Sequence, residues 1–351
     1  MSGHTHQYNL RDRDIIRDAE GRLFVVLGYI QPENRALSFL KYVPASEGRW
    51  EYAGQKYQRI FYGNVEAVVD GLELVPPEYL IEDSHFNTKL LEVPHTRIQE
   101  HYRPDVRLGE IFTLGPQDSL ERAAAGMARA LQYQLGLPLS DLGVAGSIAW
   151  RGHNPEFSDI NMNVYGYETS WNLHQNYLKA SEDSHVRTRT LEEWSMGISR
   201  VLNRIPALDP DDLKRLFARR FAFYYDDRCI GVTPVLRPDE VPIAHGSESY
   251  IQLDNELVRT IFHIENADHG IFHPALLRGT SNPLSKYNDI EITRIMIYDG
   301  AFTGLFQSGD EIEVYGTLQK VIERTTDDIE FYQIMIGTKD GAGREYIRLL
   351  E

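Results

Sequence analysis

Asp159 and Asn161 carry side-chain oxygens that could bind a divalent cation. They lie in the segment Ser-Asp-Ile-Asn-Met-Asn-Val, which begins at Ser158 and alternates polar and apolar residues with the period of a β-strand. Residues two apart share one face of a strand, so we expect the carboxylate and the amide oxygen to lie side by side. Hard cations prefer such oxygen ligands. The pattern predicts a Mg²⁺ site at this pair.

A turn of small residues precedes this strand. Gly146 and Ser147 follow the apolar run 142–145, and such a turn offers backbone N–H groups and a hydroxyl to a phosphate. The loop between the turn and the strand contains His153 and Ser158, which are candidates to contact a phosphate or a substrate. A polyphosphate and its metal ion therefore suit this whole segment.

The order of these residues resembles the signature of the nucleotidyltransferase (DNA polymerase β-like) superfamily. In that signature Gly-Ser is followed by Asp-apolar-Asp/Glu-apolar, and here Gly146 and Ser147 are followed by Asp159 and Asn161. The second carboxylate of the signature is thus an amide in this chain. A helix precedes the Gly-Ser strand in the superfamily, and the resemblance covers residues 105–236.

A helix is also expected at the corresponding position of this chain. Asp118 and Glu121 have the spacing of an N-terminal capping box, and Gly136 is a natural stop. Between them, apolar residues recur at helical spacing: Leu120, Ala123, Ala124, Met127, Ala130, Leu131 and Leu135. The helix and the turn therefore occur in the order that the resemblance requires.

The resemblance implies metal-dependent attack on the α-phosphorus of a nucleoside triphosphate, with release of pyrophosphate. Two divalent metals held by carboxylates activate the attacking oxygen and neutralise the leaving group in such reactions. The superfamily usually has a third carboxylate on a later strand, and the strand expected over residues 229–236 contains no acid. Asp226, with Asp227 beside it, lies just upstream and is the candidate for that ligand, although a turn role suits the pair better.

Three functions stay open on this evidence. The chain could transfer a nucleotidyl group from an NTP to an unknown acceptor, with Asp159 and Asn161 holding Mg²⁺. It could instead be a degenerate member that binds a nucleotide or another ligand, or serves as a scaffold. A third alternative is a different reaction in the same pocket, with His153 or Asp226 as acid or base.

Other basic and histidine residues have two interpretations each. Arg219 and Arg220, on a helix expected over residues 211–224, could clamp a triphosphate or face solvent. In the N-terminal part, basic and aromatic residues could face a ligand or form a solvated sheet surface: Arg35, Lys41, Lys56, Tyr57 and Arg59. Three histidines could form a metal site or belong to a hairpin with scattered polar residues: His263, His269 and His273.

Composition bounds the class of protein. The 351 residues include 42% hydrophobic and 11% aromatic residues, as in ordinary globular proteins. The net charge of −16 disfavours general nucleic-acid binding but allows a local basic site for a nucleotide or small-molecule ligand. The single cysteine, Cys229, excludes an intrachain disulfide. Without an apolar run of about 18 residues or a signal-peptide pattern, we expect a cytoplasmic protein that does not associate with membranes.

The pattern of elements predicts an α+β fold with three units. Residues 1–104 form an N-terminal β-rich unit, and residues 105–244 form a nucleotidyltransferase-like unit with a mixed sheet and helices. Residues 245–351 read as all-β, with turn signals between short strands, and predict a small barrel of OB-like type. Its strands are expected at residues 250–253, 257–264, 291–298, 311–321, 330–336 and 346–350.

Overall fold

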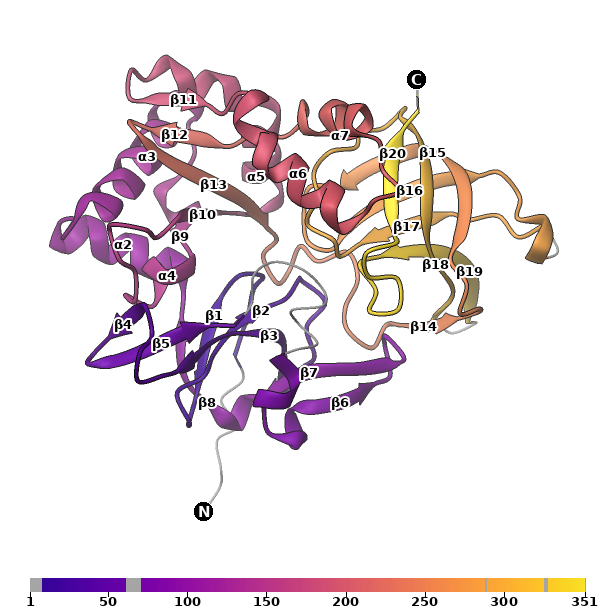
Figure 1. The fold of residues 1–351 in the computed structure, drawn as a ribbon, viewed down its shortest axis with the longest axis horizontal. Helices are drawn as coiled ribbons and strands as arrows, with labels where there is room; N and C mark the ends of the chain where they lie inside the picture. The colour runs from indigo at the N-terminus through magenta and orange to yellow at the C-terminus, as the bar shows by residue number, and fades with distance from the viewer. Residues whose placement is uncertain (1–7, 61–70, 288, 325–327, 351) are drawn as a thin grey trace.

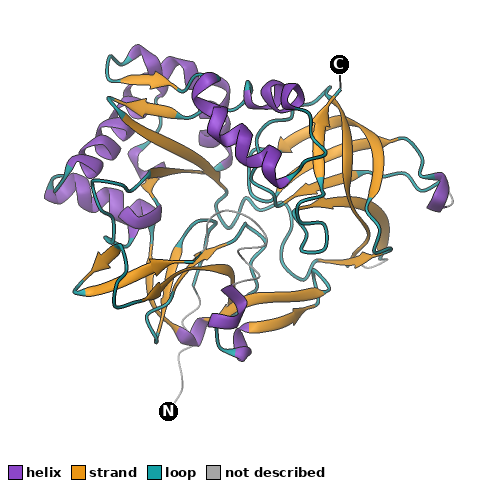
Figure 2. Cartoon of the chain, viewed as in Figure 1, coloured by secondary structure: helices purple, strands orange, loops and turns teal. Residues whose placement is uncertain are grey.

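The computed structural model describes residues 8–60, 71–287, 289–324 and 328–350. It confirms an α+β protein, built around three β-sheets that follow one another along the chain (Figure 1). Helices gather around the second sheet, whereas the first and third parts consist mainly of strands and loops (Figure 2). None of the helices in these ranges is long and apolar enough to span a membrane.

The first sheet contains the first eight strands, in the order β4-β5-β3-β2-β1-β8, with β7 paired to β3 and β6. Its strands are β1 Ile15–Asp18, β2 Leu23–Val26, β3 Arg35–Pro44, β4 Trp50–Tyr52, β5 Gln55–Arg59, β6 Leu80–Asp83, β7 Thr88–Pro94 and β8 Ile98–Tyr102. Short 3-10 turns lie at Gly71–Leu74, Pro77–Tyr79 and His95–Arg97.

A β-bulge interrupts the pairing of β2 with β3. Phe24 lies opposite Leu40, but the preceding residue of β2, Leu23, lies opposite Tyr42. Lys41 is therefore the extra residue of β3. Bulges bend a strand locally and redirect a side chain, and they occur often beside functional sites.

The second sheet has the order β11-β12-β13-β10-β9, with β10 parallel to β13 and antiparallel to β9. Its strands are β9 Leu142–Val144, β10 Ile160–Tyr165, β11 Val186–Thr188, β12 Phe223–Tyr225 and β13 Arg228–Val235. The helices of this part are α2 Pro104–Leu114, α3 Ser119–Leu135, α4 Gly146–Ala149, α5 Tyr167–Asn176, α6 Ser195–Arg204 and α7 Pro210–Phe217. Short 3-10 turns lie at Leu139–Asp141, Tyr177–Glu182 and Glu192–Trp194.

Helix α3 begins and ends where the sequence predicts. The Asp118 carboxylate accepts hydrogen bonds from the backbone N–H groups of Leu120 and Glu121, and Gly136 ends the helix in the left-handed conformation. The buried face of α3 packs with Ile160, Met162 and Val164 of β10 in one core. That core fixes which face of β10 points away from the helix.

The helix expected over residues 211–224 is wrong in its second half. Helix α7 ends at Phe217, and Phe223–Tyr225 forms β12 instead. Phe223 is fully buried and lies opposite Ile230 in an antiparallel pair. Aromatic side chains pack well on a sheet surface, so tertiary burial prevails over helical periodicity here.

The third sheet closes into a five-stranded barrel, since β15, β16, β17, β19 and β18 each pair with the next and β18 pairs back to β15. The strands are β14 Glu248–Gln252, β15 Val258–His269, β16 Ala275–Ser281, β17 Arg294–Ile297, β18 Glu311–Glu323, β19 Ile329–Ile336 and β20 Tyr346–Leu349. A 3-10 turn lies at Ser285–Tyr287. The barrel was predicted, but β16 was not. Its short apolar run gives no clear alternation, and it becomes a strand because it pairs with both β15 and β17.

A buried polar ladder lies where the barrel meets the first sheet. The Arg294 guanidinium donates to both carboxylate oxygens of Glu248 at 2.9 and 2.7 Å and, through Nε, to Gln333 at 2.7 Å. Gln333 in turn donates to Gln319 at 2.8 Å. All four side chains are buried. Such a network is favourable only while every member has its partner.

We expect Arg294→Met to lower the free energy of unfolding by roughly 3–5 kcal/mol, because it leaves the Glu248 carboxylate buried and unpaired. Urea unfolding measures the change. Arg278→Met is the matched control, since Arg278 lies opposite Arg294 on the neighbouring strand but is exposed. The same small loss in both variants would contradict the role of the buried pair.

Candidate functional site

The predicted metal-binding pair lies at the start of β10, with Asn161 on the face that points away from α3 and Asp159 just before the strand. Asp159 and Asn161 are exposed, and Asn163 is the next residue on that face but is buried. The Asn163 amide donates to the Tyr165 hydroxyl at 3.1 Å. The structure therefore places Asp159 immediately before β10 and Asn161 within it, both exposed to solvent.

Two glycines flank Asn161. Gly146, which has a φ of +62°, is so close that an added Cβ would lie 3.2 Å from the Asn161 amide nitrogen. On the other side Gly231 is the direct partner of Asn161 in β13, and its Cβ would lie 3.4 Å from the amide oxygen. Neither neighbour has a side chain, and the Asn161 amide therefore packs closely against both glycines.

The carboxylate set of a two-metal site is incomplete on this face. Beside β10, the described positions of β13 that share the face are Cys229, Gly231 and Thr233, none of them an acid. Asp226 lies at the turn between β12 and β13 with a φ of +48°, and its carboxylate binds His185 Nδ1 at 2.8 Å. This hydrogen bond raises the pKa of His185. Asp226 is thus a turn residue whose carboxylate already binds His185, and it does not complete the carboxylate set beside Asn161.

The loop residues predicted to contact a phosphate support the turn instead. His153 Nε2 lies 2.7 Å from the capping carboxylate of Asp118. Burial opposes the shift, but the backbone N–H groups that cap α3 and the His153 ring lower the pKa of Asp118. The Ser158 hydroxyl accepts a hydrogen bond from the Asn154 N–H at 2.9 Å. Ser147 is buried. His153, Ser158 and Ser147 therefore support the structure around the turn.

Asp118, Glu121 and His153 also place one potential ligand atom each within 4.8 Å of one another. Every one of them already has a protein partner. The Glu121 carboxylate pairs with the Arg107 guanidinium and accepts a hydrogen bond from the Gln117 N–H at 2.9 Å. Arg107 Nε then donates to the Ile148 carbonyl at 3.2 Å. The cluster links α2 and α3 to α4, directly behind the Gly-Ser turn.

Arg219 and Arg220 bind the barrel. The Arg219 guanidinium pairs with Asp310 and donates to the Leu305 carbonyl at 3.2 Å. Arg220 donates to the carbonyls of Gly300 and Ala301 at 2.9 and 2.8 Å, and burial lowers its pKa to about 10. Both guanidinium groups thus connect the segment after α7 to the third sheet.

A basic side chain from the first sheet faces the site. Lys41, the bulge residue of β3, is partly buried, and Asp159 is near enough to act on its charge. Burial and the guanidinium groups of Arg59 and Arg13 lower the pKa of the Lys41 ammonium to about 7, against the opposing effect of Asp159. From the sequence, Lys41 and Arg59 could face a ligand or belong to a solvated sheet surface.

The bulge that holds Lys41 has no sequence signal of its own, because it depends on how β3 pairs with β2.

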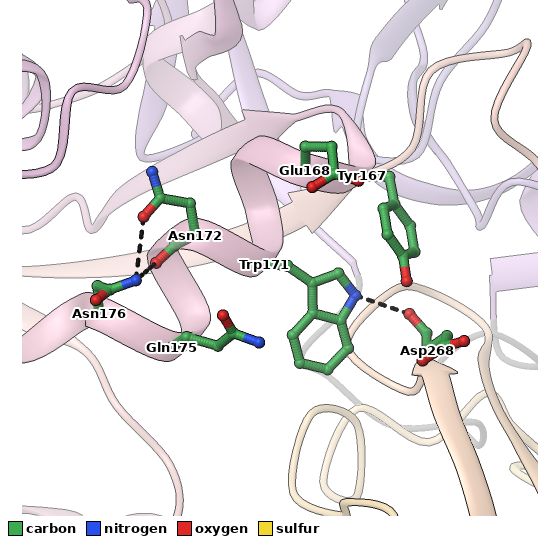
Figure 3. Close-up of a pocket in the computed structure, with 7 residues that line it drawn as sticks. All are labelled: Tyr167, Glu168, Trp171, Asn172, Gln175, Asn176 and Asp268. Carbon is green, nitrogen blue, oxygen red and sulfur yellow. Dashed lines mark hydrogen bonds between the residues drawn. The ribbon is translucent and has the colours of Figure 1, made fainter.

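A separate groove lies between α5 and the barrel (Figure 3). It has a volume of about 360 Å³ and is lined by Tyr167, Glu168, Trp171, Asn172, Gln175, Asn176 and Asp268. The Trp171 indole N–H donates to the Asp268 carbonyl at 2.8 Å and so joins its two sides. None of the predicted site residues lines it.

Comparison with other proteins shows one full-length likeness. No family model matches the chain, and no solved structure matches it. The chain is similar to the uncharacterized protein MJ1086 of Methanocaldococcus jannaschii, with 24% identity over 358 residues that cover 97% of this chain and 99% of the relative. The similarity therefore extends over all three sheets and is not confined to the segment around Asp159.

We expect Gly146→Ala to lower the free energy of unfolding by about 1–2 kcal/mol, since a left-handed φ is strained for alanine. The new methyl group would also press on Asn161. Gly109→Ala is the control, because Gly109 lies inside α2 with open space around its Cα and an ordinary φ. It should leave stability unchanged or raise it slightly. Chemical denaturation of both variants measures the difference, and equal effects would contradict the strained turn.

Proposed function

We propose that the protein binds a nucleoside triphosphate on the exposed face of the second sheet, beside Asp159 and Asn161. The observation that supports the proposal is this exposed pair: Asp159 immediately precedes β10, and Asn161 lies in β10 beside Gly146 and Gly231, which carry no side chain. A Mg²⁺ that arrives with the triphosphate would find one carboxylate and one amide oxygen there, which suits a single hard cation that keeps most of its water.

Two-metal nucleotidyl transfer does not fit the residues present. Asn161 carries no charge, its partner Gly231 has no side chain, and Asp226 is bound to His185. If Asp159 were the single carboxylate ligand of two divalent metals, most of their positive charge would be left uncompensated. We therefore favour a member of the nucleotidyltransferase-like class that binds nucleotide without efficient transfer.

The order of elements supports this ancestry. A capped helix, α3, leads into β9 and the Gly-Ser turn, and the strand with Asp159 lies between β9 and β13. The third part adds a barrel whose strand order, β15-β16-β17-β19-β18, resembles that of OB-type barrels. Fold alone does not assign a ligand, and with a net charge of −16 we do not propose nucleic acid.

A third alternative, a different reaction with His153 or Asp226 as acid or base, has less support. Each of these groups already has a protein partner: Asp118 for His153 and His185 for Asp226. Neither is therefore poised for a substrate.

Calorimetric titration with each of the four NTPs and Mg²⁺ tests the proposal. We expect binding that Asp159→Ala weakens by about 10- to 100-fold, because a charge-assisted contact is lost. Asp227→Ala is the control, since Asp227 is exposed at the β12–β13 turn. A pyrophosphate-release assay in parallel should show negligible turnover. The absence of NTP binding, or fast turnover abolished by Asp159→Ala, would overturn the proposal.

A variant that restores the missing charges tests why transfer is disfavoured. We expect Asn161→Asp with Gly231→Asp to bind Mg²⁺ or Mn²⁺ at least about 10-fold more tightly, because two adjacent carboxylates are added beside Asp159. The space beside Gly231 admits a side chain, with only an ordinary contact to Asn161. Calorimetry with the metal alone measures the change. Unchanged metal affinity would show that this face cannot organise a metal site.

A further inference from the structure

The groove between α5 and the barrel is separate from the face that carries Asp159 (Figure 3). Its volume of about 360 Å³ falls within the range of small-molecule sites, about 300–1,000 Å³. Six of its seven lining residues come from α5, and the seventh, Asp268, comes from β15 of the barrel. The two sides of the groove thus belong to elements that are far apart in the chain.

The side chains that line the groove define which ligands it suits. They are two aromatic rings, three amides and two carboxylates: Tyr167 and Trp171; Asn172, Gln175 and Asn176; Glu168 and Asp268. This set of described residues contains no lysine, arginine or aliphatic side chain. An anion would therefore meet two like charges and no opposite one, and a purely apolar ligand would desolvate mostly polar groups.

The barrel holds both aromatic rings in place. The Tyr167 ring centroid lies 5.6 Å from that of His269 and 5.9 Å from that of Phe272, and it is stacked on Phe272 with an interplanar angle of 24°. The Trp171 indole N–H donates to the Asp268 carbonyl at 2.8 Å, as Figure 3 shows. Trp171 is nevertheless only partly buried. Part of the indole ring is therefore accessible in a fixed orientation and can serve as a platform for a ligand.

Polar groups with free hydrogen-bonding capacity surround this platform. Glu168 and Gln175 are exposed, and in the described part of the chain neither side chain has a hydrogen-bond or ion-pair partner. The Asn176 amide is oriented by Asn172, to whose backbone and side-chain oxygens it donates at 3.1 and 3.2 Å (Figure 3). An amide both donates and accepts, and a carboxylate accepts. The groove therefore offers both kinds of partner to a ligand.

We propose that this groove binds a sugar ring, with one C–H face of the ring on Trp171 and its hydroxyls toward the amides and carboxylates. A pyranose has the same two-sided character as the groove, because its C–H groups form an apolar face and its hydroxyls both donate and accept. Dispersion with the indole and hydrogen bonds to Glu168 and Gln175 would replace the water that now covers these groups. The site goes beyond the proposed nucleotide site and shares no residue with it.

An organic cation is the competing class of ligand, because carboxylates and an indole ring also attract ammonium groups. The amides decide between the two classes. Each amide can bond neighbouring hydroxyls as donor and acceptor, whereas its donor half has no use for an ammonium group, which only donates. With three amides among the seven lining residues, the groove favours a neutral polyhydroxylated ring.

Saturation-transfer difference NMR tests the site with the methyl glycosides of glucose, galactose, mannose and N-acetylglucosamine, each at up to about 10 mM to detect binding in the millimolar range. At least one glycoside should receive saturation from the full-length chain, mostly on the C–H protons of one face, because that face contacts the indole. Sorbitol offers hydroxyls without a ring face and should receive none. Choline tests the competing cation and should also receive none.

Variants locate the binding in the groove. Trp171→Leu should weaken it by at least about 10-fold, because the aromatic platform is lost. Gln175→Ala should weaken it by about 2- to 10-fold through the loss of a hydrogen bond, and Gln175 is exposed, so this variant keeps the test valid if Trp171→Leu does not fold. Tyr133→Leu is the matched control, since it removes an exposed aromatic ring of α3 outside the groove.

Each of three results would overturn the sugar site. The first is that none of the four glycosides binds the unchanged chain. The second is that sorbitol or choline binds as well as the best glycoside, which would assign the groove to a general polyol or to a cation. The third is that Trp171→Leu and Gln175→Ala bind the best glycoside as the unchanged chain and Tyr133→Leu do, which would place the sugar elsewhere on the protein.

Discussion

Burial of one tryptophan fixes the first sheet against the second and thereby creates the site. Trp150 follows α4 directly and is fully buried. Its ring centroid lies 5.2 Å from that of Tyr42 and 5.0 Å from that of Tyr57, on β3 and β5. Large aromatic side chains bury roughly 150–250 Å² each, so these rings dominate the contact. Tyr42 is the residue next to Lys41, and the same contact that seats Trp150 brings Lys41 toward Asp159.

The sequence predicted the parts of this arrangement that depend on local chemistry. Asp118 caps α3, Gly136 ends it, and Asn161 alternates with the buried Ile160 and Met162 in β10, because capping, left-handed turns and strand alternation are set by neighbours in the chain. The barrel was also predictable from its turn signals. The cap, the helix end and the turn signals each depend on interactions that span only a few residues.

Features that depend on partners far away in the chain were missed or only left open. The bulge at Lys41 exists because two residues of β3, Lys41 and Tyr42, lie opposite one residue of β2. The segment β16 is a strand because it pairs with β15 on one side and with β17 on the other. Arg219 and Arg220 belong to the barrel contact, which a helical pattern over residues 211–224 could not reveal. Residue types alone named Lys41 and Arg59 as candidates, but only the packing distinguishes a ligand site from a solvated face.

The number of carboxylates at the proposed site limits the chemistry that it could support. In two-metal catalysis, protein carboxylates are needed because two divalent cations bring four positive charges beside the phosphate. Here the second sheet supplies one carboxylate, Asp159, because the positions of β13 on the face of Asn161 are Cys229, Gly231 and Thr233. One carboxylate and one amide oxygen compensate a single divalent cation better than two. In our proposal the site therefore holds one Mg²⁺ with a nucleotide and does not assemble a metal pair for transfer.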